Sequence, residues 1–294
     1  MSKPLLLTVN GTGVADPFGP GFSADLGRAF AYDPWEALNA NMAGVFYGTD
    51  LYWQPVGYPA AVIPMGKSVK TGRAEVNQLI SMHEHTGLCP KGTPLFLSGY
   101  SQGAVITGEV WAQDILSPKG IHHDRVNDVR GVIQFGDPLR CPGYARGNDV
   151  AGFPPPSRLD GFVTGGIAGW ADLRVEETTD VVLSCALDGD LYACCPVGES
   201  PWDTPGKGSG ENEPQVGQVE TRIYEFIMTG SLLHGIMSIA EGMAEEFGMP
   251  VRATIAHIQA IANGLKFAAA GPAAPHWQYQ GFIPPLVDWI TRQL

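Results

Sequence analysis

Short apolar runs alternate with helix-like segments along the chain, and this alternation constrains the fold more than any other feature. The candidate strands are residues 5–9, 44–47, 93–98, 131–135 and 181–185. Between them, residues 67–85 and 103–116 carry apolar side chains three and four positions apart, which is the spacing of one helix face. Strands that alternate with helices favour a parallel sheet covered by helices. We therefore predict an α/β core.

The rest of the chain suggests long connections and a helical insertion. Residues 141–172 and 198–218 are rich in Gly, Pro and polar side chains, which predicts surface loops. Residues 219–271 hold two helical patterns with no strand between them, as in a cap or linker, and a last helix is expected near 285–292. The predicted division is a core at 1–218, a helical linker or cap at 219–271 and a C-terminal return to the core at 272–294.

Charge and hydropathy exclude several classes of function. The chain has 30 acidic and 18 basic side chains and a formal net charge of −12, which disfavours binding to nucleic acid or to an anionic membrane surface. An uncharged substrate fits this balance better. No apolar stretch reaches the roughly 18 residues that a transmembrane helix requires, and the N-terminus runs directly into the first candidate strand. No signal peptide is expected.

Five cysteines are present, at positions 89, 141, 185, 194 and 195, and none of their spacings is that of a CxxC metal site. A zinc site is therefore not expected, and neither is any other metal or cofactor. Because the count is odd, at least one thiol stays unpaired. A disulfide between Cys185 and either Cys194 or Cys195 remains an open alternative.

The sequence Gly99-Tyr100-Ser101-Gln102-Gly103 lies between an apolar strand and a helical segment. A GxSxG motif in this context is typical of a nucleophile elbow, a strained turn that exposes the serine hydroxyl. Such a serine requires a histidine base and a carboxylate, which follow it in the order Ser, Asp, His. The alternative is that Ser101 is only a small residue in a tight turn.

Among the downstream histidines, His276 is the preferred base because it lies in a loop that precedes the last helix. His122 and His123 fall in a polar stretch expected to be a solvated loop, and His234 and His257 fall within the apolar helical patterns. The carboxylate should follow a late strand, where Asp188 and Asp190 compete. Asp137, in the sequence FGDP, ranks third because its position before a proline suits a turn.

Acyl transfer also requires donors for an oxyanion. Gln102 offers its backbone N–H at the start of a helix, and Thr12, in the loop that follows the first strand, offers an N–H and a hydroxyl. Gly11 and Gly13 in the same loop are a weak match to a dinucleotide-binding motif, because the third glycine is missing.

Several segments together resemble one family. They are VNGTG, YPAAVIPMGKSVKTG, GYSQGA, FGDP, GDLYA and PHWQY. These segments are similar to those of the phage lysin B family of mycolylarabinogalactan esterases and, more distantly, to cutinases. The resemblance covers most of the chain. It implies a cutinase-like α/β-hydrolase fold and selects Asp190 over Asp188 as the acid.

The resemblance implies a catalytic triad of Ser101, Asp190 and His276, with Thr12 and Gln102 at the oxyanion hole. It also implies hydrolysis of the ester between mycolic acids and arabinogalactan, at the host cell envelope, by a protein made in the host cytoplasm. A monomer is expected. The helical insertion would supply an acyl groove, whose candidate residues are Phe226, Leu232, Leu233, Ile236 and Met237.

Three alternatives remain open from the sequence. The first is a general cutinase-like lipid esterase, and the second is a mycolyl acyltransferase that passes the acyl group to a sugar. The third is a catalytically inactive module that binds the envelope.

Overall fold

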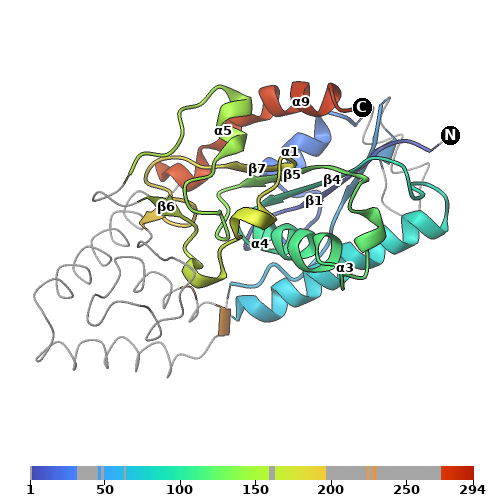
Figure 1. Cartoon of the computed structure of the whole chain (residues 1–294), viewed down its shortest axis with the longest axis horizontal. Coiled ribbons are helices and arrows are strands. Elements are labelled where there is room, and N and C mark those ends of the chain that lie inside the picture. Colours follow the sequence, from blue (N-terminus) through green and yellow to red (C-terminus); the bar gives the residue numbers. More distant parts are fainter. Residues whose placement is uncertain are drawn as a thin grey trace, which may run out of the picture.

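A computed structural model describes residues 2–31, 46–47, 50–62, 64–158, 163–196, 224, 228–229 and 273–294 (Figure 1). Within these residues the centre of the molecule is a six-stranded sheet with the order β2-β3-β1-β4-β5-β7. The strands are β1 (Leu5–Val9), β2 (Phe46–Tyr47), β3 (Tyr52–Pro55), β4 (Leu95–Tyr100), β5 (Val129–Phe135) and β7 (Val182–Cys185). Neighbours pair in parallel, except that β2 is antiparallel to β3.

Helices cover both faces of the sheet (Figure 1). One face carries α3 (Met65–His85) and α4 (Gln102–Glu109), and α4 continues as a π-helix over Val110–Leu116. The other face carries α1 (Phe22–Arg28), α5 (Arg146–Ala151) and α9 (Ile283–Thr291). A small antiparallel pair, β6 (Thr164–Gly165) and β8 (Cys195–Pro196), lies beside this core. The predicted α/β architecture is confirmed.

The hydrophobic core consists of two main clusters, one on each side of the sheet. In β1, Leu5 and Leu7 belong to the cluster under α3 and α4, whereas Leu6 belongs to the cluster under α1 and α9. Alternate side chains of a strand point to opposite faces, so a strand that is apolar at every position has to be covered on both. This explains why the central strands are continuous apolar runs.

The strand and helix predictions agree with the structure where the apolar signal is continuous. The first strand has the predicted bounds, and the starts of β4, β5 and β7 differ from prediction by one or two residues. The last helix begins at Ile283, with two prolines in its first turn, where no intrahelical N–H bond is required. Neither β3, which ends in Gln54 and Pro55, nor the short α1 was predicted.

The prediction of a surface loop over 141–172 is wrong in part, because this stretch contains α5 and β6 and packs on the sheet. A side chain at Gly147 would lie 2.5 Å from Cys185 Sγ, so only glycine allows this approach. Asn148 is buried and exchanges hydrogen bonds of 2.7 and 2.9 Å with the backbone of Ala186. The polar composition therefore reflects close backbone contact as well as solvation.

Other predictions fall outside the described residues, namely the loop at 198–218, nearly all of the 219–271 insertion, His234, His257 and the five groove candidates. All five cysteines are described and buried, and Cys185 forms a disulfide with neither Cys194 nor Cys195. Among the described helices, none combines the length and the apolar character needed to cross a bilayer.

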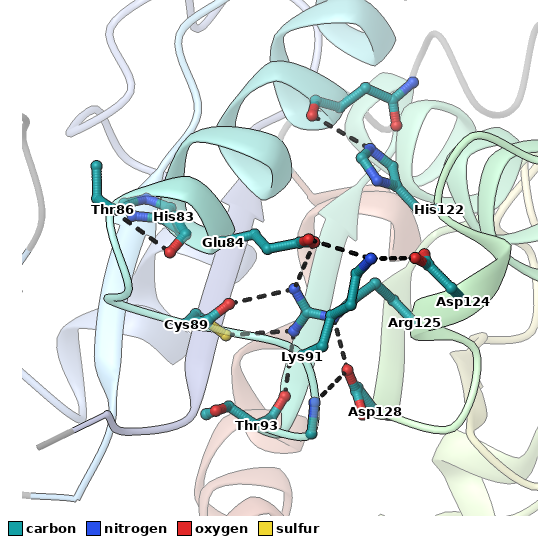
Figure 2. Close-up of polar contacts among 12 residues, drawn as sticks. His83, Glu84, Thr86, Cys89, Lys91, Thr93, His122, Asp124, Arg125 and Asp128 are labelled. Atoms are coloured by element: carbon teal, nitrogen blue, oxygen red, sulfur yellow. Dashed lines mark hydrogen bonds and ion pairs between the residues drawn. The ribbon is translucent and has the colours of Figure 1, made fainter.

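A buried guanidinium joins the amino-terminal ends of β4 and β5 (Figure 2). Arg125 is 1% exposed and donates to Asp128 Oδ2 at 2.6 Å, to Cys89 O at 3.2 Å and to Thr93 O at 3.3 Å. Glu84 of α3 lies 3.6 Å from the same group. This cluster is at the end of the sheet opposite to Ser101, which follows the carboxyl end of β4.

We expect Arg125→Met to lower the free energy of unfolding by about 3 kcal/mol, because it leaves Asp128 and two backbone carbonyls without their buried cation. Urea unfolding measures the change. Lys91→Met is the matched control, since Lys91 also contacts Glu84 but its side chain is 52% exposed, so its loss should cost much less stability than the loss of Arg125. Equal losses for the two variants would contradict this account.

Candidate active site

Ser101 lies in a strained turn between β4 and α4. Its φ of 55° and ψ of −117° are unusual for a residue with a side chain, and such strain costs on the order of 1–3 kcal/mol. The Ser101 N–H donates to Phe135 O at 3.0 Å, and the Ser101 carbonyl accepts from Ala104 N at 2.9 Å. The turn is therefore fixed by the neighbouring strand β5 and by the first turn of α4.

The two glycines of the motif allow the strand and the helix to touch. A side chain at Gly103 would collide with the carbonyl oxygens of Val9 and Asn10, at the end of β1. A side chain at Gly99 would collide with the Gly103 backbone and would lie 2.5 Å from Thr107 Oγ1. Both positions accept only glycine, which is the geometry expected of an elbow between strand and helix.

The structure brings His276 and Asp190 together. His276 Nδ1 lies 2.9 Å from Asp190 Oδ2 and 3.0 Å from Oδ1, and both residues are buried. Asp190 follows the turn after β7, and His276 lies in a 3-10 helix, Pro275–Trp277. With Nδ1 bound to the carboxylate, Nε2 is the ring nitrogen that can accept a proton from a hydroxyl.

The Asp190 carboxyl is completely buried, and burial alone would raise its pKa. The charge of His276 outweighs this effect, together with hydrogen bonds from the His276 ring, the Tyr279 hydroxyl and the Tyr192 N–H, so the pKa of Asp190 is lowered. The carboxyl is therefore ionised at neutral pH, and its charge can balance the imidazolium that forms when His276 accepts a proton.

The competing aspartates have other partners. Asp188 is exposed and accepts hydrogen bonds of 2.7 Å from both the backbone N–H and the hydroxyl of Ser157. Asp137 is buried and accepts the Leu139 N–H at 2.9 Å, as in a turn. Burial raises the pKa of Asp137 to about 7.

The expectation of a solvated loop at His122 is wrong. His122 is 5% exposed, and its Nε2 lies 3.2 Å from Asn77 O, so it is a packed histidine. Burial lowers the pKa of His122. His123 Nδ1 lies 3.1 Å from Ile115 O at the end of the π-helix.

Gln102 begins α4, where the first backbone N–H groups have no partner inside the helix. Its side chain is held by the segment before α3 and by Ser68 of α3. Gln102 Nε2 donates to Ala61 O at 2.9 Å, and the Ser68 hydroxyl lies 3.3 Å from Gln102 Oε1. The Ser68 oxygen also accepts the Ala61 N–H at 3.1 Å. These side-chain contacts restrain the position of the Gln102 backbone in addition to the hydrogen bonds of α4.

Thr12 lies on the other side of Ser101, in the loop after β1. A side chain at the preceding Gly11 would lie 3.3 Å from Ser101 Cβ, so this loop touches the serine. The Gly13 N–H donates to Ala60 O at 2.8 Å, and the Tyr58 hydroxyl donates to Asn10 O at 2.7 Å. The segment that holds Gln102 therefore also holds the Thr12 loop.

Four residues around His276 were not identified from the sequence. Tyr100 stacks on the imidazole with ring centroids 5.1 Å apart, and Tyr192 packs at 4.7 Å. A side chain at Gly136, whose φ is +55°, would lie 2.8 Å from the imidazole ring. Tyr279 donates to Asp190 Oδ2 at 2.6 Å. Gly136, Tyr192 and Tyr279 lie within FGDP, GDLYA and PHWQY, and these motifs were the available signal.

No three His, Cys, Asp or Glu side chains of the described residues gather as a metal ion would require.

Comparison with known proteins identifies the family. A model of the cutinase family matches residues 34–198. The chain is 30% identical to Endolysin B of Mycobacterium phage L5 over 295 residues, which is 99% of this chain and 100% of the relative. It is 31% identical to Endolysin B of Mycobacterium phage D29 over 296 residues, again 99% and 100% of the two chains.

The chain belongs to the cutinase-like lysin B family. The crystal structure of lysin B from Mycobacteriophage D29 is 28% identical, covers 99% of this chain and 100% of that one, and superposes with a TM-score of 0.58. The match of this chain to the cutinase family supports the activity of a carboxylic ester hydrolase. The cutinase match includes Ser101 and Asp190 but ends before His276, whereas the lysin B relatives span the whole chain.

Asp137 should make the stability of this lysin B family member depend on pH. Its pKa is about 7 in the folded protein and about 4 in an unfolded chain, so folding stability falls as pH rises from about 4 to about 7. Asp137→Asn removes this titration. We expect the variant to gain about 2–4 kcal/mol relative to wild type between pH 4 and pH 8.

Urea unfolding at several pH values measures this difference. Asp288→Asn is the matched control for the loss of one carboxyl, because Asp288 is exposed on α9. A difference between Asp137→Asn and wild type that does not change with pH would contradict the assignment.

Proposed function

We propose that this chain is a serine esterase that hydrolyses the ester bond between mycolic acids and arabinogalactan during phage lysis. The observation that carries the proposal is the buried His276–Asp190 pair beside the strained Ser101. The Ser101 N–H bonds to Phe135 O, and the next residue, Gly136, touches the His276 ring. The carboxyl end of β5 thus contacts both the Ser101 backbone and the His276 ring.

In the proposed mechanism, Ser101 Oγ attacks the ester carbonyl while His276 Nε2 accepts the hydroxyl proton. The imidazolium returns this proton to the departing arabinan hydroxyl, which leaves an acyl-enzyme. Water then attacks the acyl-enzyme with the same base, and the fatty acid is released. The ionised Asp190 stabilises the imidazolium in both steps.

The oxyanion of each tetrahedral intermediate would be bound by the backbone N–H groups of Gln102 and Thr12, with the Thr12 hydroxyl as a further donor. The hydrogen bonds through Ala61, Ser68 and Ala60 support this role, because they fix both donor segments relative to Ser101 before substrate arrives. Donors that are held in place lose little free energy to reorganisation during the reaction.

The substrate assignment draws on the relatives and on charge. The Endolysin B relatives come from phages of Mycobacterium. A mycolate ester of a sugar is uncharged at the reacting group, which suits a chain with a net charge of −12. We propose that the enzyme acts at the host envelope after release, and that the 219–271 segment contributes the acyl-chain groove.

Ser101→Ala tests the nucleophile. We expect its rate of p-nitrophenyl butyrate hydrolysis to fall at least about a thousandfold, because no other group forms the acyl-enzyme. A fluorophosphonate should label wild type at Ser101, as located by mass spectrometry. Ser117→Ala, at the end of the π-helix, is the control and should retain activity. A label on another residue would refute the mechanism.

The substrate is tested with purified mycolyl-arabinogalactan. Release of free mycolic acid by wild type and not by Ser101→Ala is the expected result. Transfer of the acyl group to added trehalose in preference to water would identify an acyltransferase instead.

The two aspartates of the same turn form a matched pair for a second test. Asp190→Asn should lower kcat about 10³- to 10⁴-fold, because the amide neither balances the imidazolium nor selects the correct tautomer. Asp188→Asn should change kcat by less than about threefold, since Asp188 bonds only to Ser157 in the described structure. The opposite ranking would transfer the role of acid to Asp188.

A further inference from the structure

We infer that Tyr279 is a positioning residue of the proposed reaction, which holds the Asp190 carboxylate in the orientation that His276 requires. This inference rests on the proposed function. The Tyr279 hydroxyl donates to Asp190 Oδ2 at 2.6 Å, and both residues are 0% exposed. A hydrogen bond to an ionised carboxylate in the absence of water is among the stronger ones in proteins.

The hydrogen bonds of Asp190 fix the plane of its carboxylate. Oδ1 accepts the Tyr192 N–H at 2.9 Å, and Oδ2 accepts the Tyr279 hydroxyl. His276 Nδ1 lies at almost equal distances from the two oxygens, 3.0 and 2.9 Å. Rotation of the carboxylate would break the bond from the Tyr192 N–H or the bond from the Tyr279 hydroxyl. These two donors therefore hold both oxygens toward the imidazole.

Tyr279 is itself held rigidly. Its ring packs against Phe22 at 5.7 Å, Phe135 at 6.2 Å and Phe282 at 5.6 Å, between centroids, within the core cluster under α1 and α9. The residue opens a 3-10 helix, Tyr279–Phe282, three positions after His276. One short segment therefore supplies both side chains that bind Asp190, and α9 anchors that segment.

The phenol acts as a permanent donor. Burial, followed by the negative charge of Asp190, raises the pKa of Tyr279 well above its ordinary value. The neighbouring titratable groups are Tyr100, Tyr192, Cys194 and Cys185, and burial raises the pKa of each. Among the described groups that surround Asp190, only His276 is of a type that exchanges a proton near neutral pH. Asp137, whose pKa is about 7, adjoins Gly136.

Tyr279→Phe should lower kcat about tenfold with KM within twofold, because the lost bond orients the acid and does not contact substrate. The acid limb of the kcat/KM profile should move to higher pH by about half a unit to one unit. Without the phenol, Asp190 keeps more negative charge against the protonated imidazole. A purely structural tyrosine would leave this limb in place.

Tyr58→Phe is the matched control, because it also removes one buried hydroxyl, which donates to Asn10 O in the Thr12 loop. It should lower kcat without moving the acid limb. The limb shift of Tyr279→Phe should persist in the Asp137→Asn background, which removes the buried carboxyl next to Gly136.

Should Tyr279→Phe fold poorly, 3,5-difluorotyrosine at position 279 tests the same bond with the ring retained. The more acidic phenol is a stronger donor, so the acid limb should move to lower pH.

A second readout does not depend on turnover. The proton on His276 Nδ1 should give a far-downfield NMR resonance, which Tyr279→Phe should move further downfield as Asp190 becomes a stronger acceptor. An acid limb and a resonance that both stay in place in folded Tyr279→Phe would overturn this inference. Failure of wild type to be labelled at Ser101 would overturn the proposed function instead, so the two failures are distinguishable.

Discussion

An ionised carboxylate without any contact with water is the constraint on which this structure depends. Asp190 is 0% exposed, and an unpaired charge in such a position would cost several kcal/mol. Its donors come from its own turn, through Tyr192, and from the C-terminal segment, through His276 and Tyr279. The charge therefore binds the C-terminal part of the chain to the carboxyl ends of the central strands.

Close backbone approach is the second requirement of the site. Gly99, Gly103 and Gly136 lie where any side chain would meet a backbone carbonyl, a hydroxyl or the imidazole ring. Gly99 is the penultimate residue of β4, Gly103 lies in the first turn of α4, and Gly136 follows β5, so these glycines gather where β1, β4 and β5 present their carboxyl ends. The glycine content of the chain thus serves the site as well as the turns.

The sequence was most informative where burial is continuous and local. The central strands are apolar on both faces, so their runs were visible, and the GxSxG motif marks the serine through neighbours in the chain. By contrast, β3 and α5 carry Gln54 and Asn148, polar residues that are buried because distant backbone or side-chain groups bond to them. The choice between two aspartates of one turn likewise depends on contacts with segments far along the chain. No local pattern contains that information.

Asp190 and His276 are separated by 86 positions. The conformational entropy lost in closing a loop grows only with the logarithm of its length, so this separation adds little to the cost of assembling the pair. Asp190 is anchored by β7, and His276 is anchored by α9 and by the packing of the Tyr279 ring in the core. The intervening chain can therefore be lengthened, shortened or exchanged with a small thermodynamic penalty at the reacting atoms. Such an arrangement would let the proposed acyl-groove segment vary in sequence and length while the proposed acid and base keep their geometry.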